Sequence, residues 1–187
     1  MSDEELIGEF QLNNEVRAFE ILVARYKNPL FNYVFRFLGD YEQTSDVVQE
    51  TMIKVYRNKD SYKSIAKFST WIYTIAGNLA KTELQRRKRK NLFSISSFGE
   101  DNESFDIKDE EATPDVLADS GIKSEIIQEA LLKISEVYRE MIILRDIQEF
   151  SYEEIAEMKG ISIGTVKSRI NRGRAQLQQL LKHIFNE

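Results

Sequence analysis

The sequence predicts an all-α protein of two small helical domains joined by a flexible acidic linker, the C-terminal domain being a helix-turn-helix. Helix breakers are rare, with 8 Gly and 2 Pro among 187 residues, and this composition favours helices. Apolar residues recur at steps of three and four on both sides of one central stretch. That stretch, residues 93–120, is rich in Ser, Asp and Glu, and its low hydrophobicity cannot offset the entropy of ordering. We therefore expect domains at 1–92 and 121–187.

Composition also excludes several classes of function. The chain has no cysteine, which rules out disulfides, thiolate metal sites and cysteine nucleophiles, and fits a reducing cytoplasm. With His183 as the one histidine, neither a histidine zinc site nor a serine–histidine triad is expected. The acidic N-terminus lacks the features of a signal peptide, and the sequence has no run of about 18 apolar residues that would cross a membrane. We expect a cytoplasmic protein without a catalytic centre, metal or cofactor.

The net charge of −5 conceals a segregation of charge along the chain. Residues 81–90 hold six basic side chains and one acid, and residues 159–186 hold six basic side chains and no acid. Between these blocks, residues 100–125 hold ten acids and two lysines. Two basic blocks on either side of an acidic bridge indicate two anion-binding surfaces in a mildly acidic protein.

The first helix predicted in the N-terminal domain carries an apolar stripe from Val16 to Leu38. The steps of three and four residues along the stripe are typical of one helix face. At Pro29 the helix either kinks or restarts with Asn28 as its cap. Gly39 is expected to end it, because glycine readily takes the left-handed conformation found after a helix.

Two further helices are expected in this domain. One begins near Thr44 or Ser45 and is amphipathic. Its buried face is predicted to contain Val47, Val48, Thr51, Met52, Val55 and Tyr56. A polar loop at 58–67 then leads into a third helix, which runs from about Ser69 into the basic block at 81–90.

The C-terminal domain is predicted to be a helix-turn-helix preceded by two amphipathic helices, near 122–134 and 138–145. Ser151 is placed to cap the first helix of the motif, and Glu154, three residues later, completes a capping box. Gly160 falls where the turn between the helices needs a left-handed residue. These local signals agree with one another and define the motif.

The second helix of the motif is expected to begin at Ser162 and to be anchored by Val166 and Ile170. Its outward face carries polar and basic side chains, namely Thr165, Lys167, Ser168, Arg169, Asn171, Arg172 and Arg174. Such side chains bond phosphates and base edges in the major groove. The alternative is a solvated basic helix within a bundle. Lys159 is unusual, because such motifs more often hold an apolar residue there.

Two surfaces of the N-terminal domain are further candidates for binding. Asp46, Gln49 and Glu50 form a compact polar face, although such a face is most often only solvated. Trp71 is by default a core residue, but an aromatic that reaches solvent can stack on an unpaired base, which contributes about 1–3 kcal/mol. The basic run 86–90 is either a solubilising tail or a set of phosphate contacts.

Together these patterns resemble the extracytoplasmic-function (ECF, group 4) sigma factors of the bacterial sigma-70 family. The N-terminal motifs are Asp46-Val47-Val48-Gln49-Glu50 with Val55-Tyr56-Arg57, and Phe68-Ser69-Thr70-Trp71-Ile72-Tyr73 with Ile75-Ala76-Gly77-Asn78. The C-terminal motifs are Tyr138-Arg139-Glu140, Leu144-Arg145-Asp146, Ser151-Tyr152-Glu153-Glu154-Ile155-Ala156 and Gly164-Thr165-Val166-Lys167-Ser168-Arg169. Their order makes the resemblance specific. The chain departs from the family at Lys159 and at Ile134-Ser135, where Leu-Pro is common.

The resemblance implies an RNA polymerase sigma factor that binds core polymerase, recognises −35 and −10 promoter elements and promotes transcription initiation. It makes 1–92 sigma region 2 and 121–187 sigma region 4. The implied core-polymerase contacts are Asp46, Gln49, Glu50 and Lys54. The implied −10 contacts are Tyr62, Lys63, Ser64, Trp71, Asn78, Lys81 and Arg86, of which the first three would form a pocket for a flipped base. The implied −35 contacts are the seven outward residues from Thr165 to Arg174.

The implied partners are core RNA polymerase, through its β′ clamp helices and β flap, promoter DNA and an anti-sigma factor. No enzymatic activity is implied, because the polymerase supplies the chemistry. Two alternatives are a DNA-binding regulator that does not enter polymerase and a helical interaction protein without nucleic-acid affinity. We also expect the free chain to sample several domain orientations, with a partner selecting one that hides the Asp46–Glu50 face and the recognition helix.

Overall fold

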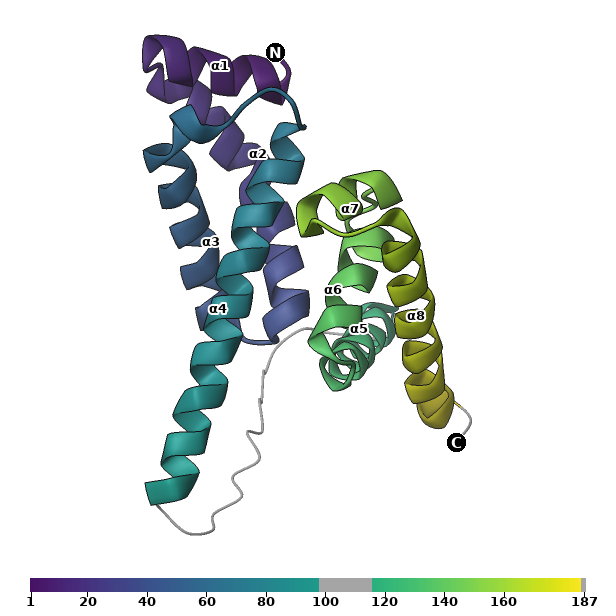
Figure 1. Cartoon of the computed structure of the whole chain (residues 1–187). Coiled ribbons are helices and arrows are strands. Elements are labelled where there is room, and N and C mark those ends of the chain that lie inside the picture. Colours follow the sequence, from purple (N-terminus) through teal and green to yellow (C-terminus); the bar gives the residue numbers. More distant parts are fainter. Residues whose placement is uncertain (98–115, 186–187) are drawn as a thin grey trace.

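The computed structural model describes residues 1–97 and 116–185, and within these ranges it is helical without a strand. The N-terminal domain contains α1 (Asp3–Asn13), α2 (Val16–Leu38), α3 (Tyr41–Arg57), the short 3-10 turn η1 (Lys59–Ser61) and α4 (Phe68–Ser97). The C-terminal domain contains α5 (Val116–Lys133), α6 (Glu136–Ile142), the π-helical turn η2 (Ile143–Ile147), α7 (Tyr152–Lys159) and α8 (Ile163–Phe185). The predicted all-α class with two helical domains is confirmed (Figure 1).

Helix α1 was not among the predicted helices, although the sequence carries a signal for it. Ser2 and Glu5 form a capping box, in which Ser2 Oγ accepts from the Glu5 amide and the Glu5 carboxylate accepts from the Ser2 amide. The helix buries Leu6, Ile7 and Phe10 and lies across one end of the N-terminal domain (Figure 1). Its burial pattern is too short to stand out as a periodic stripe.

Helix α2 runs through Pro29 without interruption, which excludes a restart at Asn28, one of the two expected alternatives. It ends where expected, at Gly39, which has a φ of 72° and donates its N–H to the Phe35 carbonyl at 2.8 Å. A left-handed residue in this position satisfies a carbonyl of the last turn.

Helix α3 begins at Tyr41, three or four residues before the predicted start near Thr44 or Ser45. Asp40 caps it by accepting a hydrogen bond from the Gln43 amide at 2.9 Å, and the hydroxyl of Thr44 donates to the Asp40 carbonyl. Thr44 is therefore in the first turn rather than at the cap. The predicted buried face is correct at Val47, Val48, Thr51 and Val55, and Met52 is partly buried. Tyr56 is 45% exposed and packs at the rim against rings of α1 and α2.

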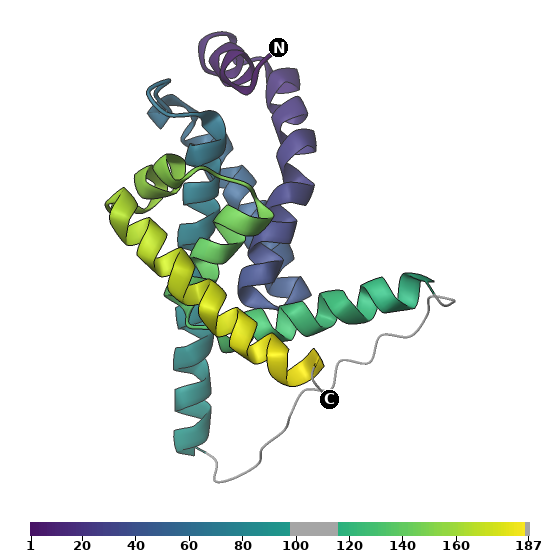
Figure 2. The same cartoon turned by 90° about the vertical axis from the view of Figure 1, so that its right-hand side faces the viewer.

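The predicted linker, 93–120, is helical at both ends. Helix α4 continues to Ser97 and α5 begins at Val116, while residues 98–115 lie outside the described ranges. Residues 78–98 contain no Gly or Pro, and extending an existing helix costs much less than starting one. Helix α4 consequently projects well beyond its neighbours (Figure 2).

The two domains pack against each other through α2 and α4 on one side and α5, α6, η2 and α7 on the other (Figures 1 and 2). One apolar core extends across both domains. In it, Tyr73 packs edge-on against Phe150 with 4.8 Å between ring centroids. Buried Arg139 donates to the carbonyl of Phe37 at 2.6 Å. The structure thus contains one specific orientation among the several expected of the free chain.

Candidate polymerase and nucleic-acid interfaces

The polar side chains of α3 form a surface on the outside of the N-terminal domain, here called the α3 face. Its residues are Asp46, Gln49, Glu50 and Lys54, all exposed. They alternate with the buried residues Val47, Thr51 and Val55, which pack toward α2 and α4. Because the C-terminal domain packs on other helices, none of its described residues covers this face.

The α3–α4 loop, residues 58–67, presents a short exposed tip. Lys63 and Ser64 are exposed as the sequence predicts. Ile65, which sequence reasoning missed, is 88% exposed. A loop has no periodicity that would single out such a residue. The tip therefore combines a positive charge, a hydroxyl and an apolar side chain that are free to meet a ligand.

Tyr62 lies beneath the α3–α4 loop rather than on its surface. It is 5% exposed, and its hydroxyl donates to the Ala66 carbonyl at 2.8 Å. Its ring contacts those of Phe68 and Trp71, with centroids 5.7 and 5.3 Å away. Among the neighbouring aromatic side chains, Trp71 is partly exposed, whereas Phe68 and Tyr73 are buried. Tyr62 therefore packs under the loop as a buried residue and does not belong to its exposed surface.

Basic side chains of α4, together with Lys67 at the end of the α3–α4 loop, meet acidic side chains of the C-terminal domain. Lys81 pairs with Glu140 at 2.8 Å, Lys67 pairs with Glu154 at 2.8 Å, and Lys88 pairs with Glu136. The two other candidates on α4 point elsewhere: Asn78 is exposed, and Arg86 pairs with Glu83 of its own helix at 2.8 Å. Sequence reasoning missed these partners, because they lie in the other domain.

The helix-turn-helix has the local structure that the sequence predicts. Ser151 and Glu154 form both hydrogen bonds of a capping box, at 3.1 and 2.8 Å. Gly160 is left-handed with a φ of 61°. Ser162 Oγ accepts from the Thr165 amide at 3.2 Å, which starts α8. The predicted helix-turn-helix, formed by α7 and α8, is confirmed.

The outward side chains of α8 form a second uncovered surface, here called the α8 face. Lys167, Ser168, Asn171 and Arg172 are exposed, and Thr165 and Arg169 are partly exposed. Arg174 is exposed but bound, because its guanidinium makes two bonds to the Asp146 carboxylate, at 3.0 and 2.5 Å. Both surfaces that a partner was expected to hide, the α3 face and the α8 face, are therefore accessible in this arrangement.

Lys159, the residue that departs from the usual motif, lies in a buried polar cluster between the domains. Its ammonium is 2.5 Å from Glu140, with side chains that are 7% and 2% exposed. The other oxygen of Glu140 binds Lys81, and the Tyr33 hydroxyl donates to Glu140 at 3.2 Å. Burial lowers the pKa of Lys159, an effect that Glu140 opposes. A Cβ at Gly77 would lie 2.6 Å from the Tyr33 oxygen, so the cluster needs a glycine there.

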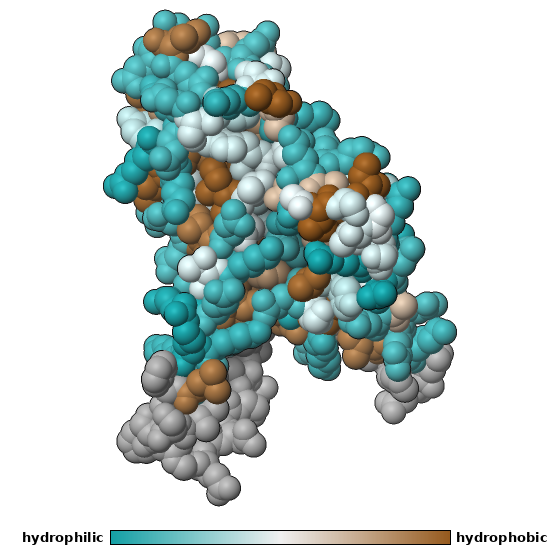
Figure 3. Space-filling model, viewed as in Figure 1, coloured by the Kyte–Doolittle hydropathy of each residue, from teal (hydrophilic) through white to brown (hydrophobic). Residues whose placement is uncertain are grey.

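The remaining surface is mostly hydrophilic on the face shown in Figure 3, with apolar residues in separate spots. Over residues 1–97 and 116–185, the chain forms no helix that is both long and apolar enough to span a membrane. The candidate sites therefore remain the α3 face, the α3–α4 loop with α4, and the α8 face.

Comparisons with known proteins match two separate segments of the chain. Residues 22–90 match the family "Sigma-70 region 2", and residues 124–177 match the family "Sigma-70, region 4". The chain is similar to the ECF RNA polymerase sigma factor SigW of Bacillus subtilis, with 34% identity over 89% of this chain and 90% of the relative. It is also similar to the ECF RNA polymerase sigma-E factor of Escherichia coli K12, with 35% identity over 99% and 97%.

A solved structure supports the same relationship. The sigma factor RpoE of Bartonella quintana, in complex with the anti-sigma factor NepR, superposes with a TM-score of 0.70 and 29% identity, covering 88% of this chain and 96% of that one. Three findings agree with one another. The two family segments occur in order, the relatives match along nearly their full length, and the fold is shared. The chain therefore belongs to the ECF sigma factors of the sigma-70 family, the promoter-recognising subunits of bacterial RNA polymerase.

Proposed function

We propose that this sigma factor uses three separate surfaces for initiation. The α3 face binds the β′ clamp helices of core polymerase, and the C-terminal domain meets the β flap. The α3–α4 loop, Trp71 and the basic side of α4 bind the −10 element. The α8 face reads the −35 element in the major groove. The observation that carries the proposal is the complete helix-turn-helix whose α8 face is exposed.

The −10 element would be bound in two ways. The exposed tip at Lys63, Ser64 and Ile65, with Trp71 beside it, would hold a base flipped out of the duplex, a step that costs a few kcal/mol. Lys81 and Arg86 would contact phosphates, which adds affinity for any sequence. Tyr62 would support this pocket from beneath. Opening of the interdomain pairs would free Lys81 for this task.

An anti-sigma factor is the further partner that we propose. The similar structure from Bartonella quintana is a complex of a sigma factor with an anti-sigma factor. Such a partner would cover the α3 face and the α8 face, which are both exposed here. We also propose that the protein acts in the cytoplasm and is not itself an enzyme, because the polymerase performs nucleotide addition.

Reconstituted transcription tests this function. Purified core polymerase and the chain should yield run-off transcripts from a promoter selected with the holoenzyme from a random library, whereas core polymerase alone should not. Specific duplex binding by the isolated chain, without transcription, would support a regulator that does not enter polymerase. Absence of any salt-dependent DNA affinity, alone or with core, would support a helical interaction protein.

A further inference from the structure

Helix α1 precedes the segment that matches sigma-70 region 2, which starts at residue 22, yet it contacts both ends of the α3–α4 loop. At the start of the loop, the Gln11 side-chain amide donates to the carbonyls of Lys59 and Tyr62, at 2.6 and 3.0 Å. At its end, the Glu4 carboxylate accepts from the Phe68 amide at 3.1 Å. These contacts cross 48 to 64 residues of sequence.

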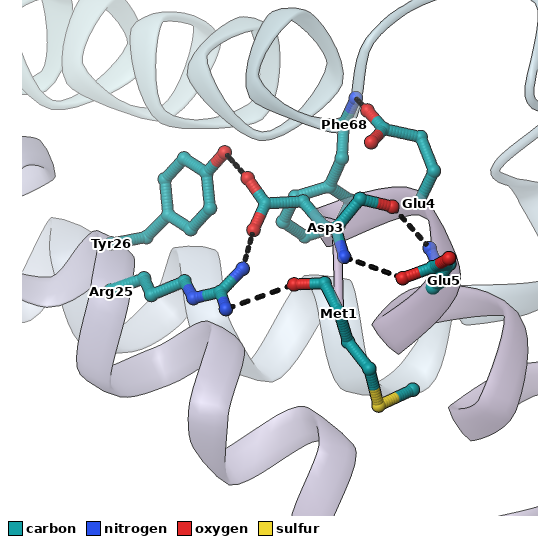
Figure 4. Close-up of polar contacts among 8 residues, drawn as sticks. Met1, Asp3, Glu4, Glu5, Arg25, Tyr26 and Phe68 are labelled. Atoms are coloured by element: carbon teal, nitrogen blue, oxygen red, sulfur yellow. Dashed lines mark hydrogen bonds and ion pairs between the residues drawn. The ribbon is translucent and has the colours of Figure 1, made fainter.

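The contact from Glu4 caps α4 from outside that helix. The first amides of a helix have no partner within it, and a carboxylate at this end also meets the positive end of the helix dipole. Glu4 therefore fixes the point where the loop passes into α4, three residues before Trp71. Figure 4 shows Glu4 reaching from α1 to the Phe68 nitrogen.

Helix α1 is itself held firmly on α2. Asp3 pairs with Arg25 at 2.5 Å and accepts the hydroxyl of Tyr26, and Arg25 also donates to the Met1 carbonyl (Figure 4). Burial and the hydrogen bond to Asp3 raise the pKa of Tyr26, which favours the protonated hydroxyl that donates to Asp3. The side chains of Leu6, Ile7 and Phe10, which α1 itself contributes, are fully buried.

The tip of the loop has little packing of its own. Lys63, Ser64 and Ile65 are exposed, so their position depends on the two anchored ends and on the Tyr62 hydroxyl bond to Ala66. A loop fixed at both ends by one helix loses less entropy when it binds a ligand than a free loop does. Supporting contacts of this kind set the geometry of a binding site.

We propose that α1 positions the α3–α4 loop for −10 recognition, with Gln11 and Glu4 as positioning residues that do not touch DNA. The proposal rests on the proposed function of this loop. It assigns to an N-terminal segment outside the matched region a role in promoter sequence choice. Gln11 sets the path of the chain at Lys59 and Tyr62, and Glu4 sets the start of α4.

The test uses holoenzyme assembled from core polymerase and the full chain, with single-stranded DNA randomised over the −10 region as the probe. Gln11→Ala and Glu4→Ala should lower the enrichment of the preferred sequence by about three- to tenfold, the equivalent of one lost hydrogen bond. Glu4→Gln keeps an accepting oxygen and should therefore retain most of the wild-type enrichment. Asn13→Ala is the control, because Asn13 bonds Glu9 on the exposed side of the same helix.

Four readouts separate positioning from general stability. Core affinity, −35 duplex binding and melting temperature should stay near wild type in both alanine variants, while amide exchange in residues 58–67 should rise. Wild-type enrichment in Gln11→Ala and Glu4→Ala would overturn the proposal, as would a parallel loss of all functions. Failure of the proposed function would appear differently, as an absence of enrichment already in the wild-type holoenzyme.

Discussion

The ammonium of Lys159 lies 2.5 Å from the carboxylate of Glu140, and both side chains are almost fully buried where the two domains meet. Glu140 also binds Lys81 and Tyr33 of the N-terminal domain. A lysine at a position that is usually apolar in this motif is thus neutralised by a carboxylate shared between the domains. This carboxylate accounts for the departure from the motif.

Replacing Glu140 should lower the free energy of unfolding by more than replacing Lys159. Glu140→Gln leaves two lysines without their counter-charge, and removing one partner of a buried ion pair typically costs about 3–5 kcal/mol. Lys159→Met keeps the length of the side chain and leaves Glu140 bound to Lys81 and Tyr33, so the loss should be smaller. Urea unfolding of both variants measures the difference. A larger loss in Lys159→Met would contradict this account of the cluster.

Charge reversal on the C-terminal domain should separate the domains. Glu136→Lys with Glu154→Lys places like charges opposite Lys88 and Lys67, and such surface pairs are sensitive to salt. Because the chain has no cysteine, dyes can be attached at Lys27→Cys and Gln176→Cys, both exposed. Energy transfer between them should fall in the double variant. Glu153→Lys, on the exposed side of α7, is the control and should leave the transfer unchanged.

Acid should weaken the contact between Glu154 and Lys67. The hydrogen bond from Lys67 lowers the pKa of Glu154 below its ordinary value of 4.5, although partial burial acts in the opposite direction. Because the folded pKa is the lower one, the contribution to stability is complete above pH 4.5 and is lost as the pH falls through the folded value. Lys67→Gln should remove part of this acid dependence in urea unfolding. If the stability of the variant and of the wild type depended equally on pH, the Glu154–Lys67 pair would be excluded as a source of the acid sensitivity.

Charge reversal on the α3 face should weaken polymerase binding without unfolding the chain. Asp46→Lys and Glu50→Lys change exposed side chains, and substitutions at such positions usually alter stability by less than about 0.5 kcal/mol. Core affinity should fall in both variants, while Glu20→Lys, an exposed change on α2, should bind like wild type. Unchanged affinity with a native melting curve would remove the α3 face from the polymerase interface.

Arg172 and Arg174 should differ in their effect on promoter choice. Arg172 is exposed on α8, and Arg172→Ala should relax −35 sequence preference at a cost of about 1–3 kcal/mol if a bidentate base contact is lost. Arg174, which Asp146 holds, is expected to contact a phosphate, so Arg174→Ala should weaken all promoter variants alike. Holoenzyme binding to a set of −35 duplexes measures both. A uniform loss in Arg172→Ala would make it a backbone contact.

The sequence predicted best those features that depend on neighbours along the chain. Ser151 and Glu154 are three residues apart in the capping box, and Gly160 needs only its own conformation to form the turn. The same is true of Gly39 at the end of α2. Helix α1 carries an equally local signal in Ser2 and Glu5. It was overlooked because its short apolar pattern gives no long stripe.

Side chains whose surroundings come from distant segments could not be placed in this way. Tyr62 was expected to reach a base, but Phe68 and Trp71 close over its ring. Gln11 had no visible role, because its acceptors are the backbone carbonyls of a loop 48 and 51 residues away. Every residue has a backbone carbonyl, so the sequence does not show which carbonyls accept a hydrogen bond from a distant side chain.

By itself, the sequence determined the helical class, the two domains, the helix-turn-helix and the family, since each depends on residue order and on periodicity within one segment. Only the tertiary structure decided which charges are neutralised. Lys159 meets Glu140 across 19 residues, and Tyr33 meets it across 107. Electrostatic and hydrogen-bonding partners are set by distance in space, and that distance is fixed only when the apolar surfaces of α2, α4, α6 and α7 pack together and exclude water.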